Sequence, residues 1–343
     1  MLGLSAWTTI GVLVFVVVPA LLLLELLRYV YLEYRRDRVP ILLYHRLIRQ
    51  EDAERGLVPD EEMIWASYDT RFAEQMRYLR DAGYTTLDLD DYLRIREGRM
   101  PLPARAVVVT FDDGYLSNYT YAYPVLKSLG QKATIFVAPE PDEHTRELVR
   151  GLDGFLSDEQ MREMAANGIS IQSHTLTHCI LSELDDEAAM RELTESRKRL
   201  AAVTGKAVEH IAIPRSGYSR RIRRLVREAG YRTACGNNKG TANGRSNLLA
   251  LPRIVIERDM TVEDFARCLT PRGSLVLRIL GNLKRIPERI GGASFAVRVR
   301  DALYGGRLRP LFAARNLKRM LIVFVLLYAI CGALFVWHLV RST

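Results

Sequence analysis

Short apolar runs alternate with helical patterns through the middle of this chain of 343 residues. The clearest run, Ala106–Phe111, is continuous and rich in valine, as expected for a strand that is covered on both faces. Seven or eight such strand–helix repeats over roughly 230 residues indicate one domain built as a parallel α/β barrel. The predicted strands cover 40–44, 84–87, 106–111, 132–138, 169–173, 208–213, 231–235 and 252–256.

The predicted helices lie between these strands, and residues suited to capping mark several of their ends. Ser157 and Ser219 fit helix N-caps, and Gly205 and Gly230 fit C-caps. The segment Glu51–Ser67 is acidic and has no periodicity, so we expect a long loop there, at the rim of a substrate site. The predicted helices cover 70–82, 89–97, 121–129, 157–167, 185–203, 219–229 and 261–269.

Two adjacent carboxylates follow the 106–111 strand, in the run Thr-Phe-Asp-Asp-Gly-Tyr that ends at Tyr115. Catalytic residues collect at the carboxyl ends of strands in such barrels. Side chains of consecutive strand residues point to opposite sides, so Asp112 and Asp113 can serve different purposes, one as metal ligand and one in proton transfer. Taken alone, Asp-Asp-Gly is also ordinary turn chemistry, and a capped turn stays open.

Two histidines four residues apart, His174 and His178, follow the predicted strand 169–173. This spacing places both imidazoles on one face of a helical turn, where they can share one cation. A single histidine is more often a core or surface residue, but the pair together with the two aspartates predicts a mononuclear metal hydrolase site. We interpret the neighbouring Cys179 as a small buried thiol and not as a ligand.

In these two motifs the chain resembles the polysaccharide deacetylases of the NodB-homology type, carbohydrate esterase family 4. The resemblance extends from about Arg38 to Leu269. The resemblance implies an irregular, partly open (β/α)7 barrel and hydrolysis of an amide on an N-acylated sugar. It implies that Asp112 is the general base. Asp113, His174 and His178 would ligate a divalent metal ion, with zinc favoured, although cobalt, nickel, manganese and iron suit the same ligand set.

Two departures from the family pattern affect the remaining site residues. In the third motif Arg215 and Ser216 stand between the expected proline and glycine; Arg215 is a candidate partner for Asp112, and a solvated loop arginine is the alternative. No histidine follows the 252–256 strand to act as the general acid. The pair Tyr44-His45 resembles a branch of the family that acts on poly-N-acetylglucosamine, so we hypothesise that His45 protonates the leaving amine; a packing role is the alternative.

The remaining histidines outside the apolar segments, His144 and His210, are expected at the surface. The arginines at 220–224 form a helix face that is expected to be solvated. Because no recognition fold accompanies them, we do not expect nucleic-acid binding.

Two apolar segments flank the predicted domain. Residues 1–24 contain no charged side chain, and residues 320–340 contain none apart from the titratable His338. Each is long enough to cross a hydrocarbon core of about 30 Å. We therefore expect two spans in a bacterial-type inner or cell membrane, within a layout of an N-terminal helix (1–37), a catalytic domain (38–270), a basic segment (271–319) and a C-terminal helix (320–343).

The positive charge of the chain is concentrated beside the second predicted span. Residues 271–319 hold twelve lysines and arginines against two acids, a net charge of +10, whereas the whole chain carries +9. Leucine, isoleucine and valine interleave with these charges, which suits helices lying on anionic membrane lipids. A solvated basic linker is the alternative.

The combined prediction is a membrane-anchored, metal-dependent sugar N-deacylase, either a deacetylase or a deformylase. Its partners would be a polysaccharide or a polyprenyl-linked sugar, membrane lipids and the polysaccharide-synthesis machinery. A catalytically silent glycan-binding scaffold of such machinery is the alternative, favoured by the altered third motif.

The charges that flank the two spans predict their orientation. Arg28, Arg35, Arg36 and Arg38 follow the first span, and only Arg341 follows the second. Basic residues favour the cytoplasmic side, so the domain is predicted in the cytoplasm, against the secreted or extracytoplasmic location usual for the family. A reporter enzyme fused after Thr343 is therefore expected on the outer side of the membrane; a reporter active only in the cytoplasm would contradict this orientation.

Overall fold

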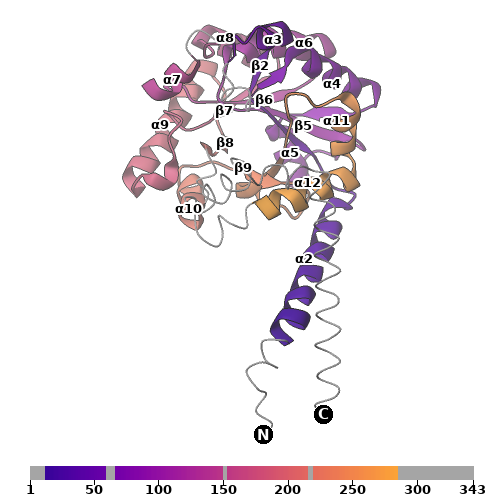
Figure 1. The fold of residues 1–343 in the computed structure, drawn as a ribbon. Coiled ribbons are helices and arrows are strands. Elements are labelled where there is room, and N and C mark those ends of the chain that lie inside the picture. The colour runs from indigo at the N-terminus through magenta and orange to yellow at the C-terminus, as the bar shows by residue number, and fades with distance from the viewer. Residues whose placement is uncertain (1–11, 59–65, 150–152, 215–218, 285–343) are drawn as a thin grey trace, which may run out of the picture. The chain divides into compact units, whose positions relative to one another are not determined.

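The computed structural model describes residues 12–58, 66–149, 153–214 and 219–284 (Figure 1). The chain divides into two units, which are described separately. One unit is Leu32–Arg278, and the other combines the residues up to Tyr31 with those from Ile279 onward.

The larger unit is built on eight parallel strands. Their order is β1-β10-β9-β8-β7-β6-β5-β4, and β1 also pairs with β5, so seven strands close a ring. Strand β4 pairs only with the first half of β5, whereas β6 pairs with its last two residues, which makes the ring irregular on this side. The strands are β1 (Ile41–Tyr44), β4 (Thr85–Leu87), β5 (Ala106–Phe111), β6 (Ala133–Val137), β7 (Ile169–Ser173), β8 (His210–Ala212), β9 (Thr233–Lys239) and β10 (Leu251–Val255).

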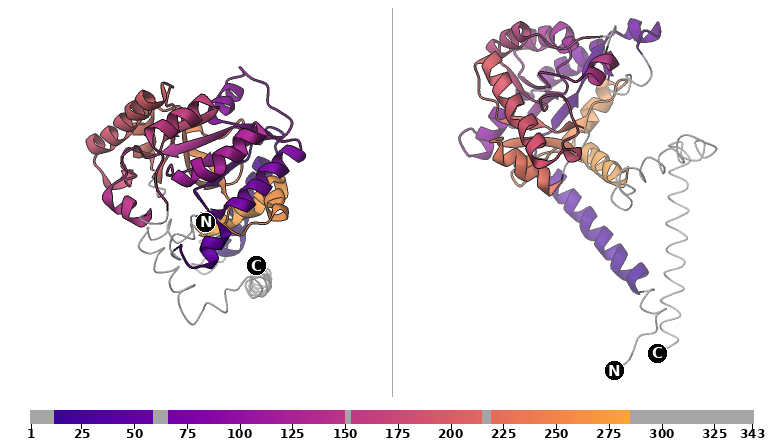
Figure 2. Two further views of the ribbon diagram at one scale, coloured as in Figure 1. Left: turned by 90° about the horizontal axis from the view of Figure 1, so that it is seen from above. Right: turned by 90° about the vertical axis from the view of Figure 1, so that its left-hand side faces the viewer.

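Helices surround the strands, as the views in Figures 1 and 2 show. Ser157 and Ser219 are the N-caps that the sequence predicts, and Gly205 ends α9 with a left-handed φ of 66°. The predicted parallel α/β barrel is thus confirmed. The helices are α4 (Asp69–Asp81), α5 (Leu89–Arg96), α6 (Tyr123–Leu129), α8 (Asp158–Ala166), α9 (Asp186–Thr204), α10 (Arg220–Glu228), α11 (Val262–Leu269) and α12 (Pro271–Lys284), with a π-turn η3 (Asn118–Ala122) before α6.

Several short elements escape the sequence prediction. Strand β2 (Arg46–Ile48) pairs with β3 (Ala66–Tyr68) in a separate two-stranded sheet, and α3 (Gln50–Glu54) lies between them. The predicted loop at 51–67 is therefore wrong at both ends, and residues 59–65 lie outside the described part. Helix α7 (Glu143–Val149) is also missed. Elements of three to seven residues contain too few positions to show a period.

The core has two parts that follow the alternation of side chains along the strands. On β5, Val107, Val109 and Phe111 belong to one large cluster that also includes helix residues such as Phe72. Val108 belongs instead to a second cluster with Phe136 and Ala212 from other strands, inside the ring. Asp112 lies four residues after Val108 in this alternation, which predicts that its side chain also faces the interior of the ring.

His210 is fully buried, so its expected surface position is wrong. It begins β8, where one ring nitrogen lies 2.8 Å from the Thr233 hydroxyl and the other lies 3.0 Å from a carboxylate oxygen of Asp90. These partners satisfy both nitrogens, which permits burial of a polar ring.

In the smaller unit, a π-turn η1 (Leu13–Val17) runs into α2 (Val18–Glu33). Together they form one helix that is long and apolar enough to cross a membrane, a property that N-terminal signal sequences share. The predicted second span at 320–343 and most of the basic segment at 271–319 lie outside the described residues.

The last residue of α2 belongs to the larger unit and is buried there. The Glu33 carboxylate accepts hydrogen bonds from the backbone and hydroxyl of Thr241, at 3.1 and 2.7 Å, and from Arg278 at 2.5 Å. Arg278 in turn donates to the Thr241 carbonyl. A buried charge that is paired and hydrogen-bonded in this way ties three distant segments together.

Candidate active site

Asp113, His174 and His178 converge at the carboxyl ends of β5 and β7. One Asp113 oxygen lies 3.2 Å from Nε2 of His174 and 3.3 Å from Nε2 of His178. Two ligand atoms on one tetrahedral zinc ion are about 3.4 Å apart, given bond lengths near 2.1 Å. The candidate ligand atoms all lie within 4.8 Å of one another. The donor set and its spacing therefore fit a divalent metal ion.

The backbone at these ligands adopts an unusual conformation. Within the described ranges, the non-glycine residues with positive φ are Asp113, Thr175 and His178, at 74°, 67° and 68°. Such conformations cost free energy and persist where the surroundings impose them, often at functional sites. Gly114 also has a positive φ, and a Cβ there would lie 2.9 Å from a methyl group of Val137, so glycine is required.

The two histidines do not lie on a helical turn, and that prediction is wrong. Residues 174–178 form an irregular loop, which we call the ligand loop, because the left-handed residues Thr175 and His178 interrupt any helix. The loop itself brings both imidazoles to the same carboxylate oxygen.

The ring of His174 is fixed by a contact on its far side. Its Nδ1 lies 2.9 Å from the Ala212 carbonyl oxygen, which can only accept, so Nδ1 carries the proton and donates it. Nε2 is then free to ligate a metal ion. The His174 backbone N–H also donates to the Val137 carbonyl at 2.8 Å. This histidine is therefore preorganised as a ligand.

Asp112 faces the interior of the ring and forms a bidentate ion pair with Arg253 of β10. The two Arg253 nitrogens donate to the two carboxylate oxygens at 2.6 and 2.7 Å. Both side chains are buried, with 6% and 2% of their surfaces exposed. Burial by itself would raise the pKa of Asp112, but the charge of Arg253, the charge of His174 and the hydrogen bonds from Arg253 together outweigh it, and the pKa lies below its usual value. Asp112 is thus held as a carboxylate.

Arg253 is the site residue that sequence reasoning missed. It is a charged residue in the apolar run Leu251–Ile256, and a buried charge in a strand calls for a partner of opposite sign. That signal could have identified it, although not its partner, which is 141 residues away. Arg215, the predicted partner of Asp112, lies outside the described residues.

His45 follows β1 and interacts electrostatically with both aspartates. Burial lowers the pKa of His45, whereas the charges of Asp113 and Asp112 act in the opposite direction. Its backbone carbonyl accepts a hydrogen bond of 2.8 Å from the Asn118 amide in η3. A largely neutral imidazole that is coupled to two carboxylates can take up and release a proton.

Asp113 has a different electrostatic environment from Asp112. Burial raises its pKa, but the interactions of Asp113 with the imidazole rings of His174, His178 and His45 together outweigh this and hold the pKa well below its usual value. The two neighbouring carboxylates are therefore both ionised but have separate partners, an arginine for one and two imidazoles for the other.

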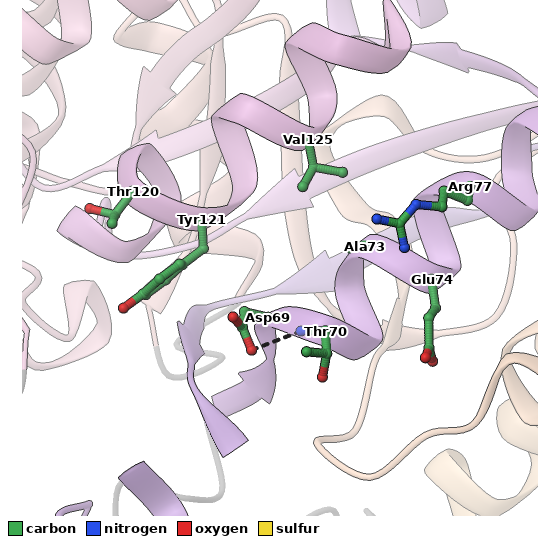
Figure 3. A pocket seen from close by; sticks show the side chains of 8 residues that line it. All are labelled: Asp69, Thr70, Ala73, Glu74, Arg77, Thr120, Tyr121 and Val125. Atoms are coloured by element: carbon green, nitrogen blue, oxygen red, sulfur yellow. Dashed lines mark hydrogen bonds between the residues drawn. The ribbon is translucent and has the colours of Figure 1, made fainter. Parts of the chain in front are cut away.

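A cavity of about 360 Å³ elsewhere on the barrel contains none of the predicted site residues. Side chains of α4 line one side of it and side chains of η3 and α6 line the other (Figure 3). It is therefore separate from the cluster of titratable groups. Its lining residues are Asp69, Thr70, Ala73, Glu74, Arg77, Thr120, Tyr121 and Val125.

Comparisons with known proteins agree on one family. The family model described as polysaccharide deacetylase matches residues 99–234. YxkH of Bacillus subtilis (strain 168), named for the same family, is 31% identical over 229 residues, which cover 66% of this chain and 75% of that protein. The poly-beta-1,6-N-acetyl-D-glucosamine N-deacetylase of Escherichia coli (strain K12) is 27% identical over 230 residues, which cover 57% of this chain and 34% of that longer protein.

A solved structure shares the fold. The Streptococcus pyogenes deacetylase PplD, in complex with acetate, superposes with a TM-score of 0.61 at 26% identity. The match covers 69% of this chain and 100% of that chain.

The ion pair between Asp112 and Arg253 predicts a large effect on stability. Arg253→Met leaves a buried carboxylate without its partner and is expected to lower the free energy of unfolding by about 3–5 kcal/mol. Adding Asp112→Asn should restore part of this loss, because it removes the unpaired charge. Urea unfolding followed by circular dichroism measures both. Equal stability of Arg253→Met and the unmodified protein would contradict the pairing.

Proposed function

We propose, because this chain belongs to the polysaccharide deacetylase family, that it removes N-acetyl groups from amino sugars of a polysaccharide with a divalent metal ion bound at Asp113, His174 and His178. The family membership makes the chain a hydrolase that acts on carbon–nitrogen bonds. The observation that supports this site best is the convergence of two imidazoles on one carboxylate oxygen beside a second, separately paired carboxylate.

The residues divide the reaction between them. A bound divalent ion would supply Lewis-acid activation of water and of the amide carbonyl. Asp112 accepts the proton of the attacking water as general base, and the paired Arg253 keeps the carboxylate ionised and fixes its orientation. Because both Asp112 oxygens already accept from Arg253, the proton must reach a second lone pair of one of these oxygens.

His45 completes the proton transfers in this proposal. Cleavage of the amide bond leaves an amine that must be protonated, and His45 is coupled electrostatically to both aspartates. His45 first takes up a second ring proton and then donates it to the leaving nitrogen, which gives a free amino sugar and acetate; the proton that Asp112 accepted from water is released and restores the starting protonation of the site. The Asn118 contact to the His45 carbonyl holds the end of β1 in place for this step.

The substrate class follows from the chemistry and from the relatives. We propose an N-acetylglucosamine polymer, supported by the Escherichia coli relative that is named as a deacetylase of such a polymer and by the pair Tyr44-His45. An N-formylated sugar or a polyprenyl-linked N-acylated sugar would also present a secondary amide to the site. The scaffold alternative is disfavoured, because a silent protein has no need of a strained backbone at Asp113 and His178 and of a preorganised ring at His174.

We further propose that the helix Leu13–Glu33 is a membrane anchor and that the C-terminal apolar segment adds a second span. The exposure of Leu21 to Leu24 along this helix, 56–66%, supports contact with lipid. Glu33, buried at its end, supports an anchor that stays attached to the barrel and not a cleaved leader.

Substitution of the two proposed proton-transfer residues should abolish turnover without loss of metal. Asp112→Asn and His45→Ala are each expected to lower kcat for amine release from an N-acetylated oligosaccharide by about 10²–10⁴-fold. Metal content by elemental analysis should be unchanged in His45→Ala. Unaltered turnover in either variant would remove that residue from the mechanism.

Substitution of a proposed metal ligand should remove the metal ion as well as the activity. His174→Ala is expected to lose both metal and activity, and a chelator should inactivate the unmodified protein reversibly, with recovery on addition of zinc or cobalt. Full activity in metal-free protein, with the metal content checked by elemental analysis, would refute the proposed site.

A further inference from the structure

We propose that Glu192 of α9 is a positioning residue that holds the ligand loop in its metal-binding conformation. The inference rests on the proposed metal site and adds a residue outside the motifs. Glu192 does not contact the candidate ligand atoms; it acts on the backbone that carries them.

The Glu192 carboxylate makes three hydrogen bonds to the ligand loop. One oxygen accepts from the backbone N–H groups of Leu176 and Thr177, at 2.9 and 3.0 Å. The other oxygen accepts from the Thr177 hydroxyl at 2.9 Å. Hydrogen bonds to an ionised acceptor are about twice as strong as neutral ones. No Lys or Arg of the described ranges forms an ion pair with Glu192, so its charge acts on the loop.

The loop needs such support because its backbone is strained and lacks regular structure. Thr175 and His178 have left-handed φ values on either side of the two peptide groups that Glu192 binds. The carbonyl groups of Leu176 and Thr177 face other partners and accept from the N–H groups of Glu140 and Asp142, at 2.9 and 3.2 Å. Without Glu192, both N–H groups would lose their partner, and the loop could relax to an ordinary conformation that separates His178 from His174.

A second residue of α9 supports the same loop one helical turn further on. The Ser196 hydroxyl lies 2.7 Å from the Ser173 hydroxyl, and Ser173 accepts from the Thr175 N–H at 3.3 Å. Residues four apart share one face of a helix, so Glu192 and Ser196 present a single polar face of α9 to the ligand loop. Because α9 spans nineteen residues and packs on the core through Leu193 and Leu200, it is a rigid support.

The test compares Glu192→Ala, Glu192→Gln and Glu192→Asp in the full chain. Alanine removes every contact. Glutamine keeps an oxygen for the two N–H groups and can donate its amide to the Thr177 hydroxyl, but it lacks the charge, so it should rescue in part. Aspartate keeps the charge but is one methylene shorter, which withdraws the oxygens from the loop in a variant expected to fold. Glu195→Ala is the matched control, since Glu195 lies on the exposed part of α9 and pairs only loosely with Lys198.

Two measurements separate this inference from the proposed function. Amide hydrogen exchange of the metal-free protein reports on the loop: exchange at Leu176 and Thr177 should accelerate on the order of tenfold or more in Glu192→Ala and Glu192→Asp. Cobalt titration followed by absorbance reports on the ligands: affinity should fall about 10–100-fold in the same two variants. It should fall by a smaller factor in Glu192→Gln, which keeps the hydrogen bonds without the charge, and stay near normal in Glu195→Ala.

The outcomes differ in what they overturn. Unchanged exchange and cobalt affinity in Glu192→Asp, or in Glu192→Ala if it folds, would overturn the role of Glu192 while leaving the metal site intact. Absence of cobalt binding in the unmodified protein would overturn the proposed metal site, and the exchange data would still decide whether Glu192 holds the loop. Equal losses in Glu195→Ala would show a general effect of α9 and would also overturn the inference.

Discussion

The buried ion pair between Asp112 and Arg253 is the constraint on which the site depends. Two opposite charges inside a ring of strands can be accommodated only as partners, so β5 and β10 must hold a fixed register across the interior. This pair turns Asp112 inward and leaves Asp113, the next residue, to meet the imidazoles. The different partners of two neighbouring carboxylates therefore follow from one arginine on a distant strand.

Strain and support are distributed unevenly in this barrel. In the described ranges, the non-glycine residues with left-handed φ are the proposed ligands Asp113 and His178 and Thr175, which follows the third proposed ligand. Each of these segments is held by groups that take no part in chemistry: Val137 against Gly114, Ala212 against His174, and Glu192 against the ligand loop. The scaffold thus stabilises a backbone shape that the local sequence alone would not adopt.

The sequence predicted the barrel and the clustering of Asp113, His174 and His178, because long strands, capped helices and a dense set of donor residues leave clear patterns. The sequence prediction was wrong where contacts between residues far apart in the chain override the local pattern. His174 and His178 have helical spacing, but Thr175 is left-handed and breaks the turn. The residues around Arg253 do not indicate which residue is its partner. His210 is buried because Asp90 and Thr233 bind its two ring nitrogens. Strands β2 and β3 are too short to show a period.

The burial of Glu33 bears on where this chain can be shortened. Its carboxylate fastens the turn at Thr241, which lies between β9 and β10, to Arg278 near the end of the larger unit. Trimming the chain at the start of β1 would leave Arg278 facing an empty, desolvated space and would loosen the approach to the strand that carries Arg253. A shortened version that begins at Leu32 keeps this fastening and omits the exposed leucines of α2.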